Sequence, residues 1–201
     1  MKYKYEILEK SVVYDGFFRL ERYRLQHELF AGGWSREMQR ECLERGQAVA
    51  VLPYDPERDR VVLIEQFRTG AIKDPDGPWL LEIVAGIVEE GETHQDVARR
   101  ETVEEAGCKL FDIIPISHCF VSPGGTTETV AIFCGRVDTA RTGGIHGVDE
   151  EHEDIRVHVF PRSEAIAMVR NDRIRSAPAV IALQWLALNF ESLRERWVKP
   201  E

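Results

Sequence analysis

The sequence predicts a mixed α and β domain preceded by a small β region, and three observations carry this prediction. Residues 1–46 contain short stretches of apolar and polar alternation, which are typical of strands. From Gln47 onward the stretches become strongly apolar, as expected for buried strands. Near the C-terminal end, apolar residues recur at spacings of three and four, the pattern of a core-facing helix. We therefore expect two domains, residues 1–46 and residues 47–201.

The N-terminal region is expected to form a small antiparallel sheet. Its candidate strands are YEILEKSVVYDG, FFRLERYRLQHELF and SREMQRECLERG, with Gly16 and Gly32-Gly33 as interruptions. Strands this polar bury little apolar surface, so the sheet should pack on the second domain, on a partner subunit, or on both. An extension of the main sheet is an equally weighted alternative.

In the second domain, strands are expected on both sides of a central helix. AVAVLPY and RVVLIEQFR should form a buried hairpin across residues 55–59, and Leu80–Val84 is a short strand candidate. Further strand candidates are IIPISHCFV, TVAIFCGRV and IRVHVF. A short helix should start near Pro161 and stop near Asn171, and a longer one should begin at Pro178. The apolar stripe of the longer helix comprises Leu183, Leu186, Phe190, Leu193 and Trp197.

The central helix is predicted over residues 93–106 by its end signals. Thr93 is a good N-cap with Asp96 three residues later, and Gly107 suits a left-handed C-terminal cap. Helical spacing then places Ala98, Thr102 and Ala106 on the side that can face a core.

Three carboxylates, from Glu101, Glu104 and Glu105, fall on the neighbouring arc of this helix. Like charges four residues apart cost roughly 0.2 to 0.5 kcal/mol on an isolated helix, and burial raises the cost. Arg100 reaches Glu104 but is not expected to neutralise the Glu101 and Glu105 pair as well. A solvated acidic face is the alternative, but a divalent cation such as Mg²⁺, which prefers carboxylate oxygens and phosphates, fits better.

The order of these residues resembles a known signature. Gly86, five residues, Glu92, seven residues, and then RETVEEAGC from Arg100 is similar to the Nudix box of hydrolases that cleave nucleoside diphosphates linked to another moiety. The charged and glycine positions match, and Thr102 and Cys108 stand where larger aliphatic residues are commoner. The resemblance implies a Nudix-like α/β/α sandwich with a mixed sheet, which the periodicity alone does not establish.

Much of the chain is similar to the ADP-ribose pyrophosphatase branch of this family, through EQFR, the box, SPGGTTE and GIHGVDEEHEDIRVHVF. This resemblance implies Mg²⁺-dependent hydrolysis of ADP-ribose to AMP and ribose 5-phosphate, with Mn²⁺ as a possible substitute. Hydrolysis of another nucleotide sugar, such as GDP-mannose, is one alternative. A non-catalytic module that senses ADP-ribose is another, although three clustered glutamates argue against a pure binder.

The resemblance also implies roles for individual residues and a homodimer with exchanged N-terminal regions. Glu151 would accept the proton, Arg100 would orient the carboxylates of the helix, and Glu104 joins them in the catalytic set. The implied metal ligands are the carbonyl of Ala85 and the side chains of Glu101, Glu105 and Glu153. The implied substrate-binding residues are Arg40, Glu41, Arg45, Arg68, Ser122, Pro123, Gly124 and Glu128.

Two loops carry part of this implied site. Residues 122–128 contain glycines that let backbone amides approach a ligand, although a flexible turn is the alternative. Residues 139–154 combine glycines with an acidic run, which we interpret as a mobile lid; a solvated surface loop is the alternative.

The composition limits which partners the protein is expected to bind and in which compartment it is expected to work. The formal net charge of -9 argues against nucleic-acid binding. The N-terminal residues contain no apolar stretch typical of a signal peptide, and no run is long enough to span a membrane. Four scattered cysteines suggest neither a zinc site nor a disulfide framework. We expect a cytoplasmic enzyme with no membrane partner.

Overall fold

The computed structural model describes residues 3–198, and for Glu151 it describes the backbone alone. The chain divides into two compact units. The first extends to Gln47 and also includes Phe120–Thr129, and the second comprises Ala48–Cys119 and the chain from Val130 onward. No helix in the described part of the chain is both long and apolar enough to cross a membrane.

The first unit contains a three-stranded antiparallel sheet in the order β1-β2-β3. Its strands are β1 (Tyr5–Asp15), β2 (Arg19–His27) and β3 (Met38–Glu44). This confirms the predicted small sheet, and the alternative of an extended main sheet is wrong for the described residues. Residues 120–129 join this unit because Leu43 donates to the Gly125 carbonyl at 2.8 Å and accepts from the Thr127 amide at 3.0 Å.

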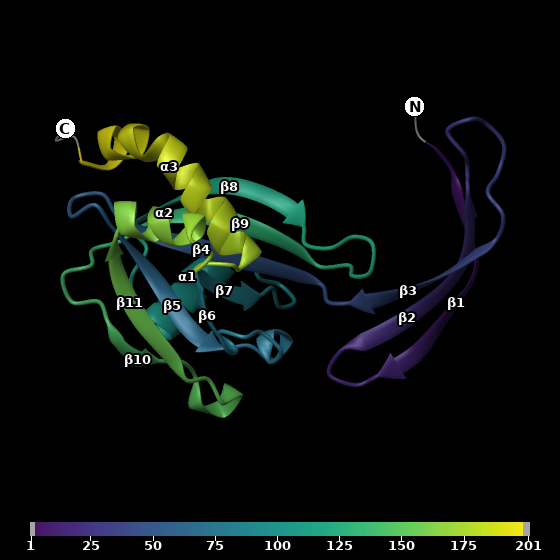
Figure 1. The fold of residues 1–201 in the computed structure, drawn as a ribbon, viewed down its shortest axis with the longest axis horizontal. Coiled ribbons are helices and arrows are strands. Elements are labelled where there is room, and N and C mark those ends of the chain that lie inside the picture. The colour runs from purple at the N-terminus through teal and green to yellow at the C-terminus, as the bar shows by residue number, and fades with distance from the viewer. Residues whose placement is uncertain (1–2, 199–201) are drawn as a thin grey trace. The chain divides into compact units, whose positions relative to one another are not determined.

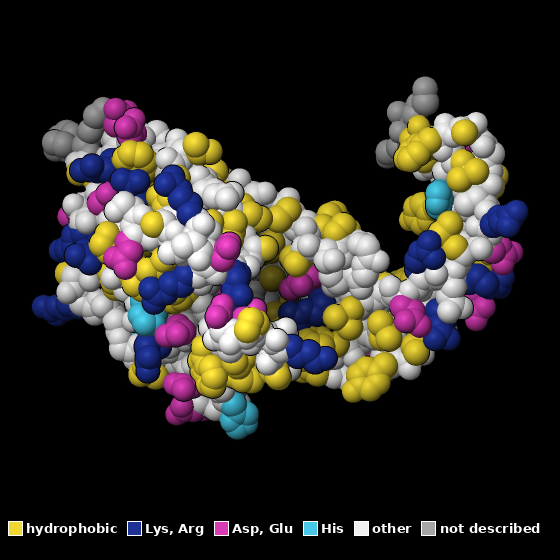
Figure 2. Space-filling model, in the orientation of Figure 1, with side chains coloured by type: hydrophobic (Ala, Val, Ile, Leu, Met, Phe, Trp, Pro, Cys, Tyr) yellow, Lys and Arg dark blue, Asp and Glu magenta, His cyan; other side chains and the backbone are white. Residues whose placement is uncertain are grey.

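Large apolar side chains remain exposed on the first unit (Figure 2). Phe17 and Phe30 are 88% and 90% exposed, and Tyr5 and Tyr14 are more than half exposed. A three-stranded sheet has too little surface to bury such side chains by itself, so this unit presents an apolar surface to its surroundings.

The second unit is built on an eight-stranded sheet with the strand order β10-β11-β5-β4-β9-β8, in which β6 pairs with β5 and β7 pairs with β4. The strands are β4 (Gln47–Asp55), β5 (Arg60–Phe67), β6 (Trp79–Glu82), β7 (Val84–Ile87), β8 (Asp112–Phe120), β9 (Thr129–Arg136), β10 (Gly144–His146) and β11 (Ile155–Pro161). Two short 3₁₀ turns, η1 (Thr69–Ala71) and η2 (Asp149–Glu151), lie in the connections. The predicted hairpin is confirmed as β4 and β5.

Helices cover both faces of this sheet (Figure 1). Helix α1 (His94–Ala106) packs Val97 and Ala98 on one face, against Val62 and Ile64 of β5. Helices α2 (Arg162–Arg170) and α3 (Ala177–Val198) cover the other face, where Leu63 lies in the core. The predicted stripe of α3 is buried at four positions, and Phe190 is partly buried against the same core. The alternation of β5 therefore separates two cores, and even-numbered positions point toward α1.

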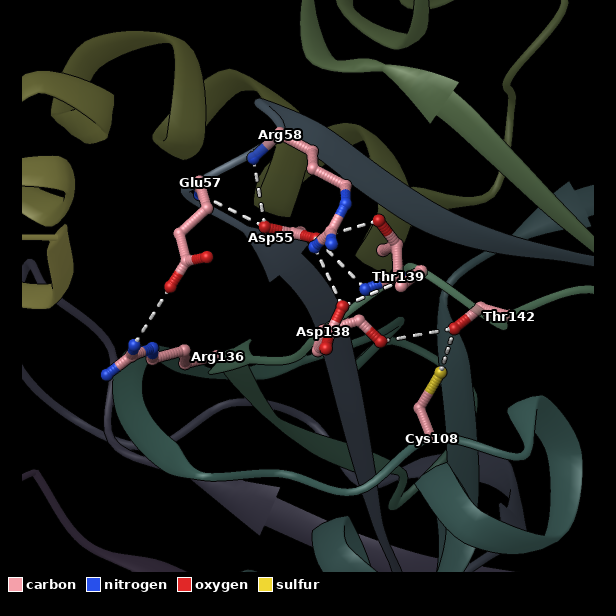
Figure 3. A network of polar contacts seen from close by, with 9 residues as sticks. Asp55, Glu57, Arg58, Cys108, Arg136, Asp138, Thr139 and Thr142 are labelled. Carbon is pink, nitrogen blue, oxygen red and sulfur yellow. Dashed lines mark hydrogen bonds and ion pairs between the residues drawn. The ribbon is translucent and has the colours of Figure 1, made fainter.

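A polar network at the end of the β4–β5 hairpin fixes the start of the 139–154 loop (Figure 3). Buried Asp55 accepts hydrogen bonds from the Thr139 amide at 2.9 Å, the Thr139 hydroxyl at 2.7 Å and the Arg58 guanidinium at 3.0 Å. Burial opposes ionisation of this carboxyl, but the bonds from Thr139 and Arg58 outweigh it and hold the pKa of Asp55 below its usual value. The loop thus begins from a fixed point.

The structure differs from the sequence prediction in two places in this unit. The single strand expected over Leu80–Val84 is two strands, because β6 pairs with β5 whereas β7 pairs with β4. Within the 139–154 loop, Gly144–His146 pairs with β11 as β10. Three residues flanked by glycines carry no readable alternation, so sequence periodicity could not reveal this strand.

Candidate active site

The local sequence of α1 determines where its carboxylates lie. The Thr93 hydroxyl accepts from the Asp96 amide at 3.2 Å, and Asp96 accepts from the Thr93 amide at 3.2 Å, which is the predicted capping box. Gly107 has φ 61° and ends the helix through bonds to carbonyls of the last turn. Such a cap contributes about 1 kcal/mol. The helix therefore has fixed ends, and Glu101 and Glu105 lie one turn apart.

Glu101 and Glu105 point toward the sheet over β7. The Glu105 carboxylate, 2% exposed, accepts from the Ala85 amide at 2.9 Å. Glu101 lies so close to Gly86 that any Cβ at residue 86 would collide with its carboxylate. Burial raises the pKa of Glu101 to about 7 and that of Glu105 to about 8. Both carboxyls are thus held where ionisation is costly without a compensating positive charge.

Arg100 binds more of the acidic cluster than expected. It makes a two-pronged bond to Glu92 at 3.0 and 3.1 Å, and its Nη1 donates to Glu101 at 2.7 Å and to Glu104 at 3.0 Å. The expectation that Arg100 would serve Glu104 but not the pair was therefore wrong for Glu101, because the guanidinium fork spans several acceptors. It was right for Glu105. Glu92, which the predicted site did not include, helps to hold Arg100, and its place in the box was the available signal.

Glu153 approaches the same cluster from the loop. Its negative charge raises the pKa of both Glu101 and Glu105, and its own Oε2 accepts from the Val148 amide at 3.1 Å. The backbone of Glu151 lies in η2, and its side chain lies outside the described part of the structure.

The loop is tied to the C-terminal end of α1 at three points. The Gly147 amide donates to the Glu104 carbonyl at 3.3 Å. The His146 ring lies against Gly107, where a Cβ would collide with it. The Thr142 hydroxyl is 3.2 Å from the Cys108 sulfur (Figure 3). Helix α1 therefore positions both its own carboxylates and the loop that carries Glu153.

Arg68 supplies positive charge near the cluster. It donates to Glu82 of β6 at 2.6 Å, and its charge favours ionisation of Glu105. Because Arg68 is still partly exposed, its guanidinium combines a fixed position with access to an anionic ligand.

The other expected substrate-binding residues all lie in the first unit. Arg45 and Glu128 meet at 3.3 Å, and the Arg45 guanidinium lies 4.3 Å from the centre of the Phe18 ring. Glu41 pairs with Arg22 at 3.0 Å, whereas Arg40 donates to the carbonyl of Gln39. Residues 122–126, which include Ser122, Pro123 and Gly124, form a turn in which the Ser122 carbonyl accepts two amides. The structure thus brings Arg45 and Glu128 together.

The donor set suits a hard divalent cation. Glu101, Glu105 and Glu153 are mutually repelling carboxylates in a partly buried site, and Mg²⁺ is bound by such oxygens. Among residues 3–198, no three acidic, histidine or cysteine side chains form a ready-made metal cage. In this arrangement Glu101 is bound by Arg100 and Glu105 by the Ala85 amide.

Comparison with known proteins identifies the family. A model described as NUDIX domain matches residues 44–182. The chain belongs to the Nudix family. An ADP-ribose pyrophosphatase of Escherichia coli (strain K12) is 50% identical to this Nudix chain over 192 residues, covering 96% of the chain and 92% of that protein. A GDP-mannose pyrophosphatase of Cronobacter sakazakii is 34% identical over 190 residues, covering 94% and 97%.

A solved structure described as an ADP compounds hydrolase has a TM-score of 0.72 to this chain, at 19% identity, and covers 94% of the chain and 96% of its own. This likeness confirms the predicted Nudix-like sandwich with its small N-terminal sheet.

Proposed function

We propose that this chain is a Mg²⁺-dependent hydrolase that cleaves the diphosphate of ADP-ribose to AMP and ribose 5-phosphate. The observation that carries the proposal is the pair of carboxyls of partly buried Glu101 and buried Glu105, with pKa values raised to about 7 and 8 beside Glu153 and Arg68. A bound divalent cation would polarise phosphoryl oxygens and acidify water. Mn²⁺, with similar ligand preferences, should substitute.

The chain's residues divide the remaining work. Glu101, Glu105, Glu153 and the Ala85 carbonyl would hold the cation, and Arg100, which also bonds Glu104, would keep Glu101 oriented. Arg68 would bind the diphosphate. Glu151 would take the proton of the attacking water while the oxygen of that water bonds to one phosphorus and the bridging oxygen leaves with the other phosphate.

The ADP-ribose preference rests on the greater similarity to the ADP-ribose pyrophosphatase than to the GDP-mannose pyrophosphatase. In this proposal the first unit contributes Arg40, Glu41, Arg45 and Glu128 at the adenine and ribose end, with the turn at Ser122, Pro123 and Gly124 beside them. A purified-protein panel of ADP-ribose and GDP-mannose with Mg²⁺ tests the assignment. Release of AMP from ADP-ribose supports it; hydrolysis of GDP-mannose alone, or binding without cleavage, overturns it.

The assembly and compartment belong to the same proposal. The exposed apolar surface of the first unit fits a homodimer in which N-terminal regions are exchanged. Four free cysteines are typical of a reducing compartment, so we place the enzyme in the cytoplasm, with small-molecule substrates and neither nucleic-acid nor membrane partners.

A further inference from the structure

Gln66 of β5 has a buried amide group that the site described above does not use. The residue is 7% exposed, and its side-chain Nε2 has no hydrogen-bond partner among the described residues. Buried amide donors in proteins are nearly always paired, because an unmade bond leaves their desolvation uncompensated. The few exceptions call for an explanation.

The register places this amide on the face of the sheet that carries α1. Gln66 alternates with Val62 and Ile64, which pack with Val97 and Ala98 of the helix. Arg68 follows two residues later in the same direction, and its positive charge lowers the pKa of Glu105. Gln66 therefore lies between the core under α1 and the arginine beside the buried carboxylates.

The neighbouring strands place apolar side chains beside this amide. On one side Gln66 pairs with Leu80 of β6, whose side chain is apolar. On the other side, the last pair between β5 and β11 is Glu65 with Arg156. The next residue of β11 is Ile155, which is also apolar and fully buried. The carboxylate of Glu82, opposite Ile64, is bound by Arg68 at 2.6 Å.

We propose that Gln66 is a substrate-binding residue whose amide N–H donates to a non-bridging oxygen of the diphosphate, an inference that rests on the proposed hydrolysis of a nucleoside diphosphate sugar. A neutral donor is suited to this place, because it binds a phosphate oxygen without competing with the cation for the carboxylates. Arg68 would bind the same anion through its positive charge, and Gln66 would bind it through a hydrogen bond from a neutral amide.

The test compares Gln66→Met, which keeps the length of the side chain but removes the amide, with Gln184→Met on the exposed surface of α3. The dissociation constants of inorganic pyrophosphate and of α,β-methylene ADP-ribose are measured with Mg²⁺ by calorimetry. For Gln66→Met we expect both to rise about tenfold, since such a loss corresponds to one hydrogen bond to a charged acceptor. The Tm without ligand should not fall, because an unpaired donor has been removed. Gln184→Met should match the wild type in each measurement.

A second measurement on the wild type does not depend on the variant folding. The side-chain amide signals of Gln66 and Gln184 are followed by ¹⁵N NMR while pyrophosphate is added with Mg²⁺. Movement of the Gln66 signal alone supports the inference; an unmoved Gln66 signal, or Gln66→Met affinities within twofold of wild type, overturns it. The wild type could release no AMP from ADP-ribose while Gln66→Met still weakens pyrophosphate binding. That result would contradict the proposed function and leave the Gln66 contact with a diphosphate intact.

Discussion

The Glu105 carboxylate and the Ala85 amide are joined by a 2.9 Å hydrogen bond between α1 and β7. This bond places the buried Glu105 carboxyl at Ala85, whose backbone carbonyl we propose as a metal ligand. A helix and a strand are thus fixed to each other at the point where the cation is expected.

Neutralising either carboxyl of α1 should abolish turnover while the fold persists. Glu101→Gln and Glu105→Gln remove an anionic ligand at nearly constant volume, so metal affinity should fall by at least roughly 10- to 100-fold. AMP release against Mg²⁺ concentration and the far-UV circular dichroism are the measurements. Glu164→Gln, at an exposed position of α2, is the matched control. Near wild-type rates in limiting Mg²⁺ would show that the site is misassigned.

The metal-free protein should lose stability as the pH rises from about 5 to above 8. The pKa values of Glu101 and Glu105, near 7 and 8 in the folded state, exceed the ordinary value of 4.5, so the folded state binds more protons across this range. The stability contributed by these two carboxyls is therefore fully present below pH 4.5 and is lost as the pH rises through the folded pKa values. Each kcal/mol lost lowers the Tm by about 2 to 4 °C at this chain length.

Mg²⁺ should reverse this fall, with its largest stabilisation above pH 7, and should release protons on binding. Thermal unfolding at a series of pH values, with EDTA or Mg²⁺, measures both effects. Glu105→Gln should flatten the metal-free profile. A wild-type Tm that rises between pH 6 and 8.5 in EDTA would contradict the assigned shifts.

The two glutamates of the loop should separate by their response to metal. Glu151→Gln should lower kcat by roughly 10²- to 10⁴-fold while substrate still binds, because it removes the proposed proton acceptor. Glu153→Gln should raise the Mg²⁺ concentration needed for half-maximal rate and recover in excess metal. The measurement is kcat against Mg²⁺ for both variants and wild type. Recovery of Glu151→Gln alone would mean that the roles are exchanged.

Apolar residues of the first unit should support a dimer. Phe17→Ser and Phe30→Ser should weaken association, since each removes a ring that is largely exposed in one chain. Leu188→Ser, at an 85% exposed position on α3, is the matched control. Sedimentation velocity over a range of micromolar concentrations reports the assembly, and a full-length protein that stays monomeric there would refute it.

Strong local signals made α1 predictable. Thr93, Asp96 and Gly107 define its ends through hydrogen bonds within a few residues, and these appear in the structure as expected. The apolar runs of β4 and β5 were equally readable because both strands are almost wholly buried. Burial on this scale leaves an apolar run that few other structures explain.

Features that depend on contacts distant in sequence were not readable. Gln66 is an unpaired donor beside Leu80, its register partner on β6. The membership of residues 120–129 in the first unit likewise depends on bonds to Leu43, some 80 positions away. Spacing along the chain contains no information about such partners until the register of the sheet is known.

The attachment of the loop to the end of α1 sets different tolerances for inserted residues. One residue added between Glu101 and Glu105 would rotate everything beyond it by about 100°, carrying Glu105 away from Ala85 and moving the cap that supports His146. Residues added at the tip near η2 would leave the anchors at Thr142 and Gly147 in place. They would still displace Glu151 and Glu153, so related chains should keep a constant length in the segment that carries these two glutamates as well as in the helix.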